Sequence, residues 1–271
     1  MGSGKLRLMA IGAHPDDCDL KVGGLALLYR KAGHAVKFVS TTNGDTGHHQ
    51  MGGGPLAKRR LTEALAAAKI ARIEYEVLDI HNGALEPNLN NRWTIVRLIR
   101  EFKPDIVITH RPNDYHPDHR YTSQIVQDSA FTVTVPNVMA LTPHLTYNPV
   151  FAYMSDRFRK PYPFTADAVV AIDTVLKRKM RMLDCHVSQF YEWLPHNAGK
   201  AMPPRDTAKR LEWLTRWRAA AFADEADANR ELLGKFYGEK KGARVKYAES
   251  FEICEYGAQP DEKRLRELFL L

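Results

Sequence analysis

Residues Leu6–Asp17, Leu-Arg-Leu-Met-Ala-Ile-Gly-Ala-His-Pro-Asp-Asp, decide the fold class. The apolar run Leu6–Ile11 has the length and composition of a short buried strand, and helical spacing follows it over Val22–Ala32. Between them lies a loop with one histidine and two aspartates, where a dinucleotide-binding turn would carry the glycines of GxGxxG. This stretch therefore predicts a strand, a polar loop and a helix, without a nucleotide-binding fingerprint.

The same alternation continues over the first half of the chain. Further strands are predicted at Ala35–Thr41, Ile73–Leu78 and Asp105–Thr109, and further helices at Leu56–Ala71, Arg92–Phe102 and Asp118–Val133. Strands that alternate with helices at this spacing favour a parallel sheet covered on both faces. The predicted fold class is α/β, a Rossmann-like doubly wound and mostly parallel sheet.

The second half is less regular. Strands are predicted at Val150–Ser155, Ala168–Ile172 and Phe251–Cys254, helices at Thr174–His186, Asp206–Phe236 (broken near Ala223–Asp227) and Asp261–Leu270, and a proline-rich loop at Pro195–Pro204. Repeats and linkers are not evident. We expect a single α/β domain over residues 1–271, with a core at about 5–186 and a C-terminal α+β elaboration at about 187–271.

Composition indicates a globular protein of a reducing compartment. Hydrophobic residues make up 44% and charged residues 26% of the 271 residues, and no apolar run approaches the length of a membrane span. The three cysteines are far apart and form no CxxC pair. Since no secretory leader is evident at the start, we expect a cytoplasmic protein without a membrane partner.

The net charge is +7, from 39 basic and 32 acidic residues. Such an excess suits nucleic acid or an anionic substrate. The basic residues are spread along the chain, however, and the densest cluster, Lys177–Arg181, is interpreted as the solvated face of a helix. A nucleic-acid partner is therefore unlikely on composition.

Polar residues gather after three of the predicted strands. They are His14, Asp16 and Asp17 after the first, Asn43, Asp45, His48 and His49 after the second, and His110, Asn113, Asp114, His116, Asp118 and His119 after the fourth. Six of the 11 histidines lie in these loops. In a doubly wound sheet the first and fourth strands are neighbours, and ligands bind in the crevice at their carboxyl ends. The first and fourth loops should therefore face each other.

Two pairs in these loops have the spacing of metal ligands. His14 and Asp17 are three residues apart, as are His116 and His119, which leaves four candidates for the three protein positions of a catalytic zinc site. Asp16 would then lie beside the metal, free to take a proton from bound water, and a spare imidazolium could stabilise an oxyanion. Helix capping is the alternative role for Asp16 and Asp118.

Other histidines have weaker interpretations. His34 and His110 are interpreted as structural. His48 and His49 lie beside Gly52-Gly53-Gly54 in a loop with the composition of a mobile lid, where substrate contact and simple solvation are equally consistent with the sequence.

Two motifs resemble a known family. The run Ala13-His14-Pro15-Asp16-Asp17, followed by His116-Pro117-Asp118-His119, resembles the PIG-L (LmbE-like) deacetylases. These are zinc hydrolases that remove acetyl or other acyl groups from N-acylated glucosamine units and related amides. Arg60-Leu61-Thr62-Glu63 is similar to the family's Arg-x-x-Glu, and His186-Val187-Ser188-Gln189 to its late His-x-Ser-Gln motif.

The resemblance implies a role for each matching residue. His14, Asp17 and His119 would bind one metal ion per chain, Zn²⁺ or alternatively Fe²⁺ or Co²⁺. Asp16 would be the general base, and His116 would stabilise the oxyanion and protonate the leaving amine. Substrate contacts would come from Arg60 and, from the C-terminal half, His186. Arg60 could instead be an exposed arginine paired with Glu63.

The loop after the third strand departs from the family pattern. Many members that act on sugars carry Asp-Gly or Asp-Ser there, and this chain has Asn82-Gly83. We expect Asn82 to alter sugar recognition, so that the substrate is an amino-sugar conjugate or another small-molecule amide. Related proteins are often homo-oligomers, which makes self-association possible here.

Two other functions remain open at this point. Histidine and aspartate clusters at strand ends also serve metal-dependent phosphoesterases, which commonly hold two metals. The helix Asp206–Arg218 carries basic residues with Trp213 and Trp217, which could stack on bases in a non-catalytic nucleic-acid or partner-binding module. We favour the alternative in which the two tryptophans cover the core.

Overall fold

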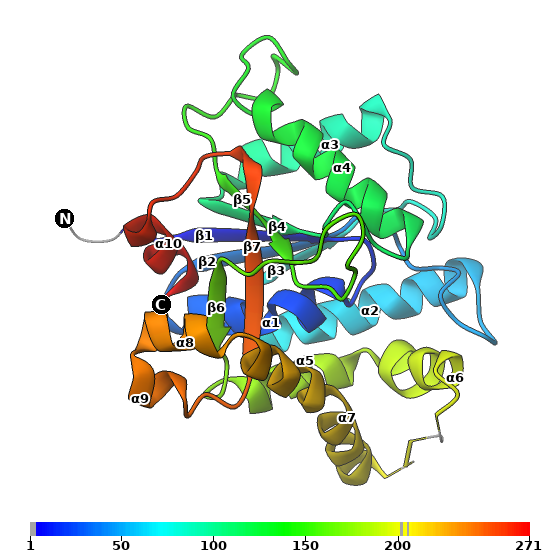
Figure 1. Cartoon of the computed structure of the whole chain (residues 1–271). Helices are drawn as coiled ribbons and strands as arrows, with labels where there is room; N and C mark the ends of the chain where they lie inside the picture. The colour runs from blue at the N-terminus through cyan, green and yellow to red at the C-terminus, as the bar shows by residue number, and fades with distance from the viewer. Residues whose placement is uncertain (1–3, 201–202, 205) are drawn as a thin grey trace.

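The computed structural model describes residues 4–200, 203–204 and 206–271. Seven strands of these ranges form one sheet in the order β3-β2-β1-β4-β5-β7-β6 (Figure 1). The strands are β1 (Arg7–Gly12), β2 (Ala35–Ser40), β3 (Glu74–Val77), β4 (Ile106–Thr109), β5 (Val150–Met154), β6 (Ala168–Ala171) and β7 (Ala248–Gly257). Strands β1–β5 pair in parallel, and β7 is antiparallel to both of its neighbours. The predicted fold class is confirmed.

Helices cover both faces of the sheet. They are α1 (Asp17–Lys31), α2 (Gly53–Ala71), α3 (Leu89–Phe102), α4 (Pro117–Thr132), α5 (Leu176–Cys185), the π-helix η1 (Ser188–Trp193), α6 (Leu194–Asn197), α7 (Thr207–Ala228), α8 (Arg230–Tyr237), α9 (Glu239–Gly242) and α10 (Glu262–Phe269). Helices α3 and α4 lie on one face, and α1, α2 and α5 on the other (Figure 1). Each face has its own apolar core, because alternate side chains of the buried strands point to opposite sides.

The prediction that the first and fourth strands are neighbours is confirmed. Leu8 of β1 pairs with Ile106 of β4, and Ile11 pairs with Thr109. Since both strands run in the same direction, the polar loops that follow them leave the sheet at the same edge.

The C-terminal segment is part of the same sheet. Strand β7 lies between β5 and β6, and it extends beyond the predicted Phe251–Cys254 in both directions. The long C-terminal helix is interrupted at Asn229, after the predicted break at Ala223–Asp227. The predicted loop Pro195–Pro204 begins inside α6, and its residues 201 and 202 lie outside the described residues. The division into core and elaboration stays a prediction.

The prediction of a solvated basic cluster holds for Lys177 and Arg181, which are exposed, but is wrong for Lys179. Lys179, in the cluster interpreted as solvated, is fully buried. Its Nζ lies 2.5 Å from Glu249 Oε1 and donates to the Leu20 carbonyl over 2.7 Å. A cation so deep in a core requires such partners, because burial of an unpaired charge is very costly.

Glu249 reaches from β7 into the middle of α1. Its two carboxylate oxygens accept hydrogen bonds from the backbone N–H groups of Gly24 (2.6 Å) and Leu25 (2.8 Å). Gly24 leaves the room for this contact, since a Cβ there would lie 2.4 Å from Ile172 Cγ2 and 2.8 Å from Glu249 Oε1. The Lys179–Glu249 pair therefore joins α1, α5 and β7 below the sheet.

The two tryptophans of α7 pack as we favoured. Trp213 and Trp217 contact the apolar core around the fully buried Leu214, so their rings cover this core. In the described ranges, none of the helices combines the length and the apolar character needed to cross a bilayer.

Candidate active site

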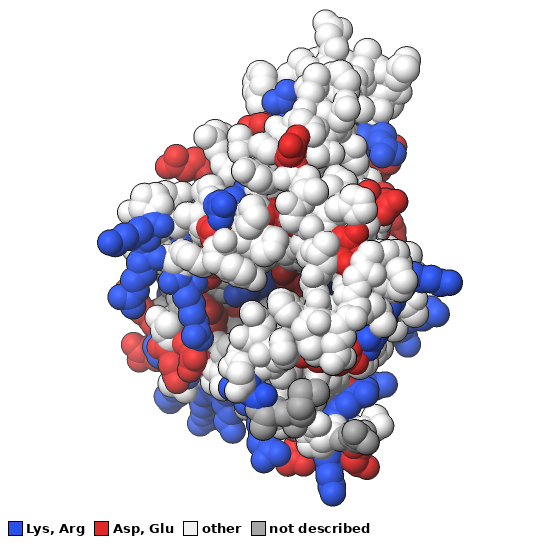
Figure 2. Space-filling model, turned by 90° about the vertical axis from the view of Figure 1, so that its right-hand side faces the viewer, with Lys and Arg blue, Asp and Glu red and all other residues white. Residues whose placement is uncertain are grey.

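A cavity of about 770 Å³ opens at the carboxyl edge of the parallel strands. Its walls come from the loops after β1, β4 and β5, from residues 46–47 after β2, and from α7. Figure 2, which views the molecule from the right-hand side of Figure 1, shows a hollow near the middle of this face with charged side chains of both signs inside it. The crevice predicted from the strand order is therefore present.

Three potential ligand atoms face one another in this cavity. His14 Nδ1 lies 3.4 Å from Asp17 Oδ2, and His119 Nε2 lies 3.1 Å from the former atom and 3.6 Å from the latter. All three side chains are at most 14% exposed. Asp17 begins α1 and His119 lies in the first turn of α4, so two helix starts hold these atoms together.

The three atoms fit one tetrahedral metal ion. With bonds of about 2.0–2.2 Å, the ligand atoms of such an ion are about 3.3–3.6 Å apart, and two imidazoles with a carboxylate suit Zn²⁺ and other first-row divalent ions. Two wider sets of potential ligands share His119, one with His14 and His116 and the other with Asp17 and His110. This group of side chains could hold a metal ion.

Further polar groups fix the orientation of the two imidazoles. His14 Nε2 lies 2.8 Å from Asn82 Oδ1 and 3.3 Å from Asp118 Oδ2. His119 Nδ1 lies 3.1 Å from Asp114 Oδ1. An acceptor at one ring nitrogen holds the hydrogen there and leaves the other nitrogen free for a metal. The free nitrogens are then His14 Nδ1 and His119 Nε2, which face Asp17.

Asp17 is held as a carboxylate from several sides. Its Oδ2 accepts hydrogen bonds from the backbone N–H groups of Ala13 (3.0 Å) and His14 (2.7 Å), and His110 Nε2 lies 3.2 Å away. Although burial opposes ionisation, the nearby histidines hold the pKa of Asp17 well below its usual range. His110, interpreted as structural from the sequence, thus belongs to this cluster, and its place after β4 was the available signal.

Asp16 does not cap α1, although it occupies the N-cap position. Its Oδ1 instead accepts a hydrogen bond of 2.8 Å from Arg60 of α2, whose guanidinium also donates to the Gly44 carbonyl. Both residues line the cavity, and Arg60 is only 2% exposed. The alternative of an exposed Arg60 paired with Glu63 is wrong, because Glu63 accepts from the backbone and side chain of Ser188.

His116 lies against the ligand group and lines the cavity. It is the N-cap of α4, and its Nδ1 accepts a hydrogen bond of 3.1 Å from the Asp118 N–H. Burial, together with the charges of His14 and His119, lowers the pKa of His116 to about 4. The ring is therefore neutral near pH 7 and carries its hydrogen on Nε2, so it can donate one hydrogen bond.

Comparison with known proteins identifies the family of this chain. The family model described as "PIG-L: GlcNAc-PI de-N-acetylase" matches residues 9–130. The chain is also 30% identical, over 207 residues, to a diacetylchitobiose deacetylase from Thermococcus kodakarensis, a match that covers 70% of this chain and 74% of that protein. The chain belongs to the PIG-L family.

Solved structures share the fold of this PIG-L chain at lower identity. The N,N'-diacetylchitobiose deacetylase from Pyrococcus horikoshii has a TM-score of 0.68 at 23% identity, covering 92% of this chain and 83% of its own. The 4-carboxy-2-hydroxymuconate hydratase from Pseudomonas putida has a TM-score of 0.74 at 17% identity, covering 94% and 99%. Since a hydratase shares the fold, the fold alone does not determine the reaction.

The remaining residues predicted to contact substrate lie at different distances from the cavity. Asn82 lines it and contacts His14. His48 turns away, with Nε2 2.9 Å from Glu192 Oε2 and Nδ1 accepting from backbone N–H groups. His186 is fully buried below the cavity, 3.2 Å from Asp19 Oδ2. Among the described residues that line the cavity, neither His48 nor His186 is present.

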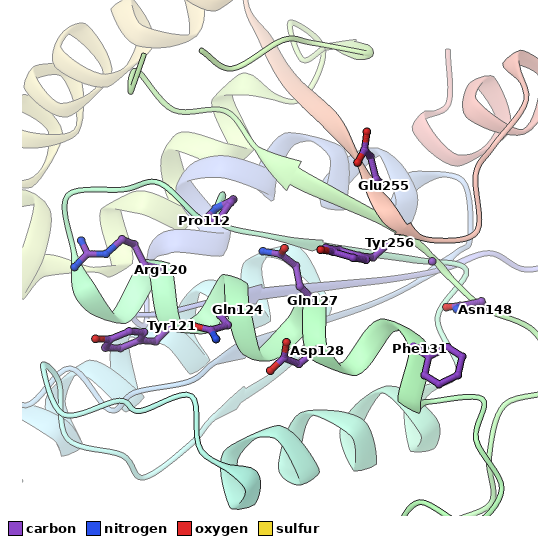
Figure 3. Close-up of a pocket in the computed structure, with 11 residues that line it drawn as sticks. Pro112, Arg120, Tyr121, Gln124, Gln127, Asp128, Phe131, Asn148, Glu255 and Tyr256 are labelled. Carbon is purple, nitrogen blue, oxygen red and sulfur yellow. The ribbon is translucent and has the colours of Figure 1, made fainter. Parts of the chain in front are cut away.

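A second cavity of similar size lies elsewhere on the PIG-L fold. It has a volume of about 810 Å³, and α4 and the end of β7 form its walls (Figure 3). Its described lining holds Gln124, Gln127 and Tyr256 and contains no histidine. The groups that could hold a metal ion therefore line the cavity at the strand ends.

Proposed function

We propose that this chain is a metal-dependent N-deacetylase that removes acetyl from an N-acetylglucosamine-type substrate, releasing acetate and a free amine. One observation carries the proposal. The ligand triangle of His14, Asp17 and His119 and the carboxylate of Asp16 line the same cavity, and Arg60 donates a hydrogen bond to Asp16 Oδ1. This arrangement supports a metal site with a separate base.

His14, Asp17 and His119 would hold one ion, with Zn²⁺ as the proposed metal and Fe²⁺ or Co²⁺ as alternatives. When bound, such an ion lowers the pKa of a water molecule to about 7 and polarises an amide carbonyl. Asp114 and Asn82 keep the two imidazoles in the orientation that ligation requires.

The chain's own groups would handle the protons. Asp16 takes a proton from the attacking water and returns it to the amine nitrogen as the C–N bond breaks. Arg60 keeps the Asp16 carboxylate oriented and offsets its charge. His116 donates its Nε2 hydrogen to the carbonyl oxygen while negative charge develops there, a contact worth about 10²–10³ in turnover.

The similarity to a diacetylchitobiose deacetylase supports an amino-sugar substrate and favours amide over phosphoester hydrolysis. A cytoplasmic location and a homo-oligomeric state are part of the proposal. Fractionation of the host cell and light scattering on the purified chain test these two points.

The proposal is tested by acetate release from N,N'-diacetylchitobiose and other N-acetylglucosamine conjugates, with a phosphoester as the competing substrate. Asp16→Asn should lower turnover by about 10²–10⁴-fold and keep one metal ion per chain. Asp128→Asn, on the outer side of α4, is the matched control. Phosphoester cleavage with two ions per chain would contradict the proposal, and loss of metal in Asp16→Asn would reverse the ligand and base assignments.

A further inference from the structure

Five cationic side chains line the active-site cavity, and they differ in their partners. Three are paired with carboxylates of the same cavity: Arg60 with Asp16 (2.8 Å), Arg111 with Asp156 (3.0 Å) and Arg157 with Asp224 (3.1 Å). The other two, Lys21 and Arg218, have no carboxylate within 4.0 Å among the described residues. These two form what we call the cationic wall.

Of the two residues of the cationic wall, Arg218 of α7 has fewer hydrogen-bond partners among the described residues. Its guanidinium makes no hydrogen bond within the described part of the chain, and its Nε is buried without a partner. The ring centroids of Trp217 and Phe190 lie 5.2 and 5.5 Å from its Cζ, so aromatic contacts hold the side chain in place. A guanidinium has five N–H donors, and a buried donor without a hydrogen bond costs free energy. A ligand that accepts hydrogen bonds from these donors can recover this cost.

Lys21 of α1 brings the second charge to the same place. It lies one helical turn after Asp17, about 6 Å along the helix axis. Its Nζ donates to the Ser155 carbonyl over 2.7 Å, which leaves two donors of the ammonium group for other partners. Burial lowers the pKa of both Lys21 and Arg218, and the charge of Arg218 adds to the effect on Lys21. Both cations would be stabilised by an anion between them.

Carboxylates lie near the cationic wall but form no ion pair with it in the described part of the chain. Three aspartates are taken by the three paired arginines, and Asp17 and Asp114 face the histidines of the candidate metal site. Glu225 opposes the lowering of the Lys21 pKa and Asp16 opposes that of Arg218, and both carboxylates act from beyond ion-pair distance. The cavity therefore keeps two cations without a direct carboxylate partner, and Lys21 lies one helical turn after Asp17.

We propose that Lys21 and Arg218 form an anion subsite, and that the substrate is an acylated amino sugar with a carboxylate or phosphate on its carrier portion. This inference rests on the proposed deacetylase function. A guanidinium and an ammonium suit either anion, because both offer several oxygens to N–H donors. The subsite would orient the carrier so that the acyl group lies at the metal ligands.

The test compares kcat/KM for three substrates: neutral N,N'-diacetylchitobiose, N-acetylmuramic acid with its carboxylate, and N-acetylglucosamine 6-phosphate. In the wild type, kcat/KM for the better anionic substrate divided by kcat/KM for the neutral substrate should exceed 1. Arg218→Gln and Lys21→Gln should each lower that ratio by about 10–100-fold, chiefly through KM. Arg216→Gln removes the same charge from the same helix as Arg218, outside the cavity lining, and should keep the ratio.

The two anionic substrates separate carboxylate from phosphate as the natural group. An equal effect of Arg218→Gln on neutral and anionic substrates, or a preference of the wild type for the neutral one, would overturn the subsite. Quenching of Trp217 fluorescence by N-acetylglucosamine 6-phosphate gives a readout that needs no turnover. If no substrate is hydrolysed but this binding is lost in Arg218→Gln, the subsite stands and the deacetylase function fails.

Discussion

Arg60 lies 2.8 Å from Asp16 although 44 residues separate them in the chain. This contact joins α2 to the N-cap residue of α1, and the Asp16 carboxylate makes no hydrogen bond to the N–H groups of the helix it precedes. The proposed base is therefore oriented by tertiary structure rather than by its own loop.

Arg60→Gln should remove that orientation. The Asp16 carboxylate would stay in its buried position without its cation, which costs about 3–5 kcal/mol of unfolding free energy. Misplacement of the base should lower kcat on the order of 10²-fold. Urea unfolding and steady-state kinetics measure the two effects.

Arg59→Gln is the matched control for this prediction. Arg59 is the preceding residue of α2, is 29% exposed and pairs with Glu192 through two hydrogen bonds and with Glu63. Arg59 does not line the cavity, so its loss should lower the unfolding free energy by about 1–3 kcal/mol and leave kcat within about twofold. Equal losses in the two variants would contradict the specific role of Arg60.

Asp114→Asn should weaken metal binding without removing a ligand. The carboxylate of Asp114 holds the His119 ring by its Nδ1, so its loss should raise the metal Kd by about 10–100-fold. Competition with a chelator measures this Kd, with Asp128→Asn of the same helix as control. A Kd equal to that of the wild type would show that His119 is oriented by other groups.

Gly23 and Gly24 are neighbours in α1 but should respond in opposite ways to alanine. A Cβ at Gly24 would lie 2.4 Å from Ile172 Cγ2, so Gly24→Ala should destabilise the fold by about 1–3 kcal/mol. A Cβ at Gly23 would meet Lys179 and Met182 at ordinary distances of 3.6 Å. Gly23→Ala should therefore stabilise by up to about 1 kcal/mol through helix propensity. Thermal unfolding of the two variants gives the comparison, and equal shifts would contradict the tight packing at Gly24.

The Lys179–Glu249 pair should make stability depend on pH. Burial lowers the pKa of Lys179 to about 8, below the 10.5 of an exposed lysine. Between these values the unfolded chain binds a proton that the folded chain has lost, so the unfolding free energy should rise from pH 8 to pH 10.5. Below pH 8 this contribution should be constant, since Lys179 is charged in both states.

Lys179→Met removes the titrating group and serves as the reference. The difference in unfolding free energy between wild type and variant should change across pH 8–10.5 in the direction that favours the wild type at high pH. A constant difference over this range would show that the folded chain keeps the ordinary pKa of Lys179.

The elements that hold the site could be predicted from local patterns. The period of apolar residues located β1 and β4, and the doubly wound order made them neighbours, so the loops of His14 and His119 were expected to meet. Neither step needed a side-chain contact. Because both steps depend only on the arrangement of the backbone, they could be predicted from the sequence.

The polar partners could not be predicted, because they depend on contacts between distant segments. Asn82 was expected to bear on sugar recognition, and its contact with His14 exists only once three loops have met at one edge. Lys179 looks solvated in its own helix, and only Glu249, 70 residues later, explains its burial. The antiparallel direction of β7 likewise follows from its partners rather than from its own residues.

The place of β7 between β5 and β6 has a consequence for how the chain folds during synthesis. Strand β6 pairs with β7 in this sheet, so it leaves the ribosome well before the strand that satisfies its backbone groups. At about 5–20 residues per second, this interval lasts seconds. Throughout that time β5 and β6 present unpaired edges that can join a neighbouring nascent chain. Translation speed and chaperone access over residues 172–247 should therefore govern the yield of native protein.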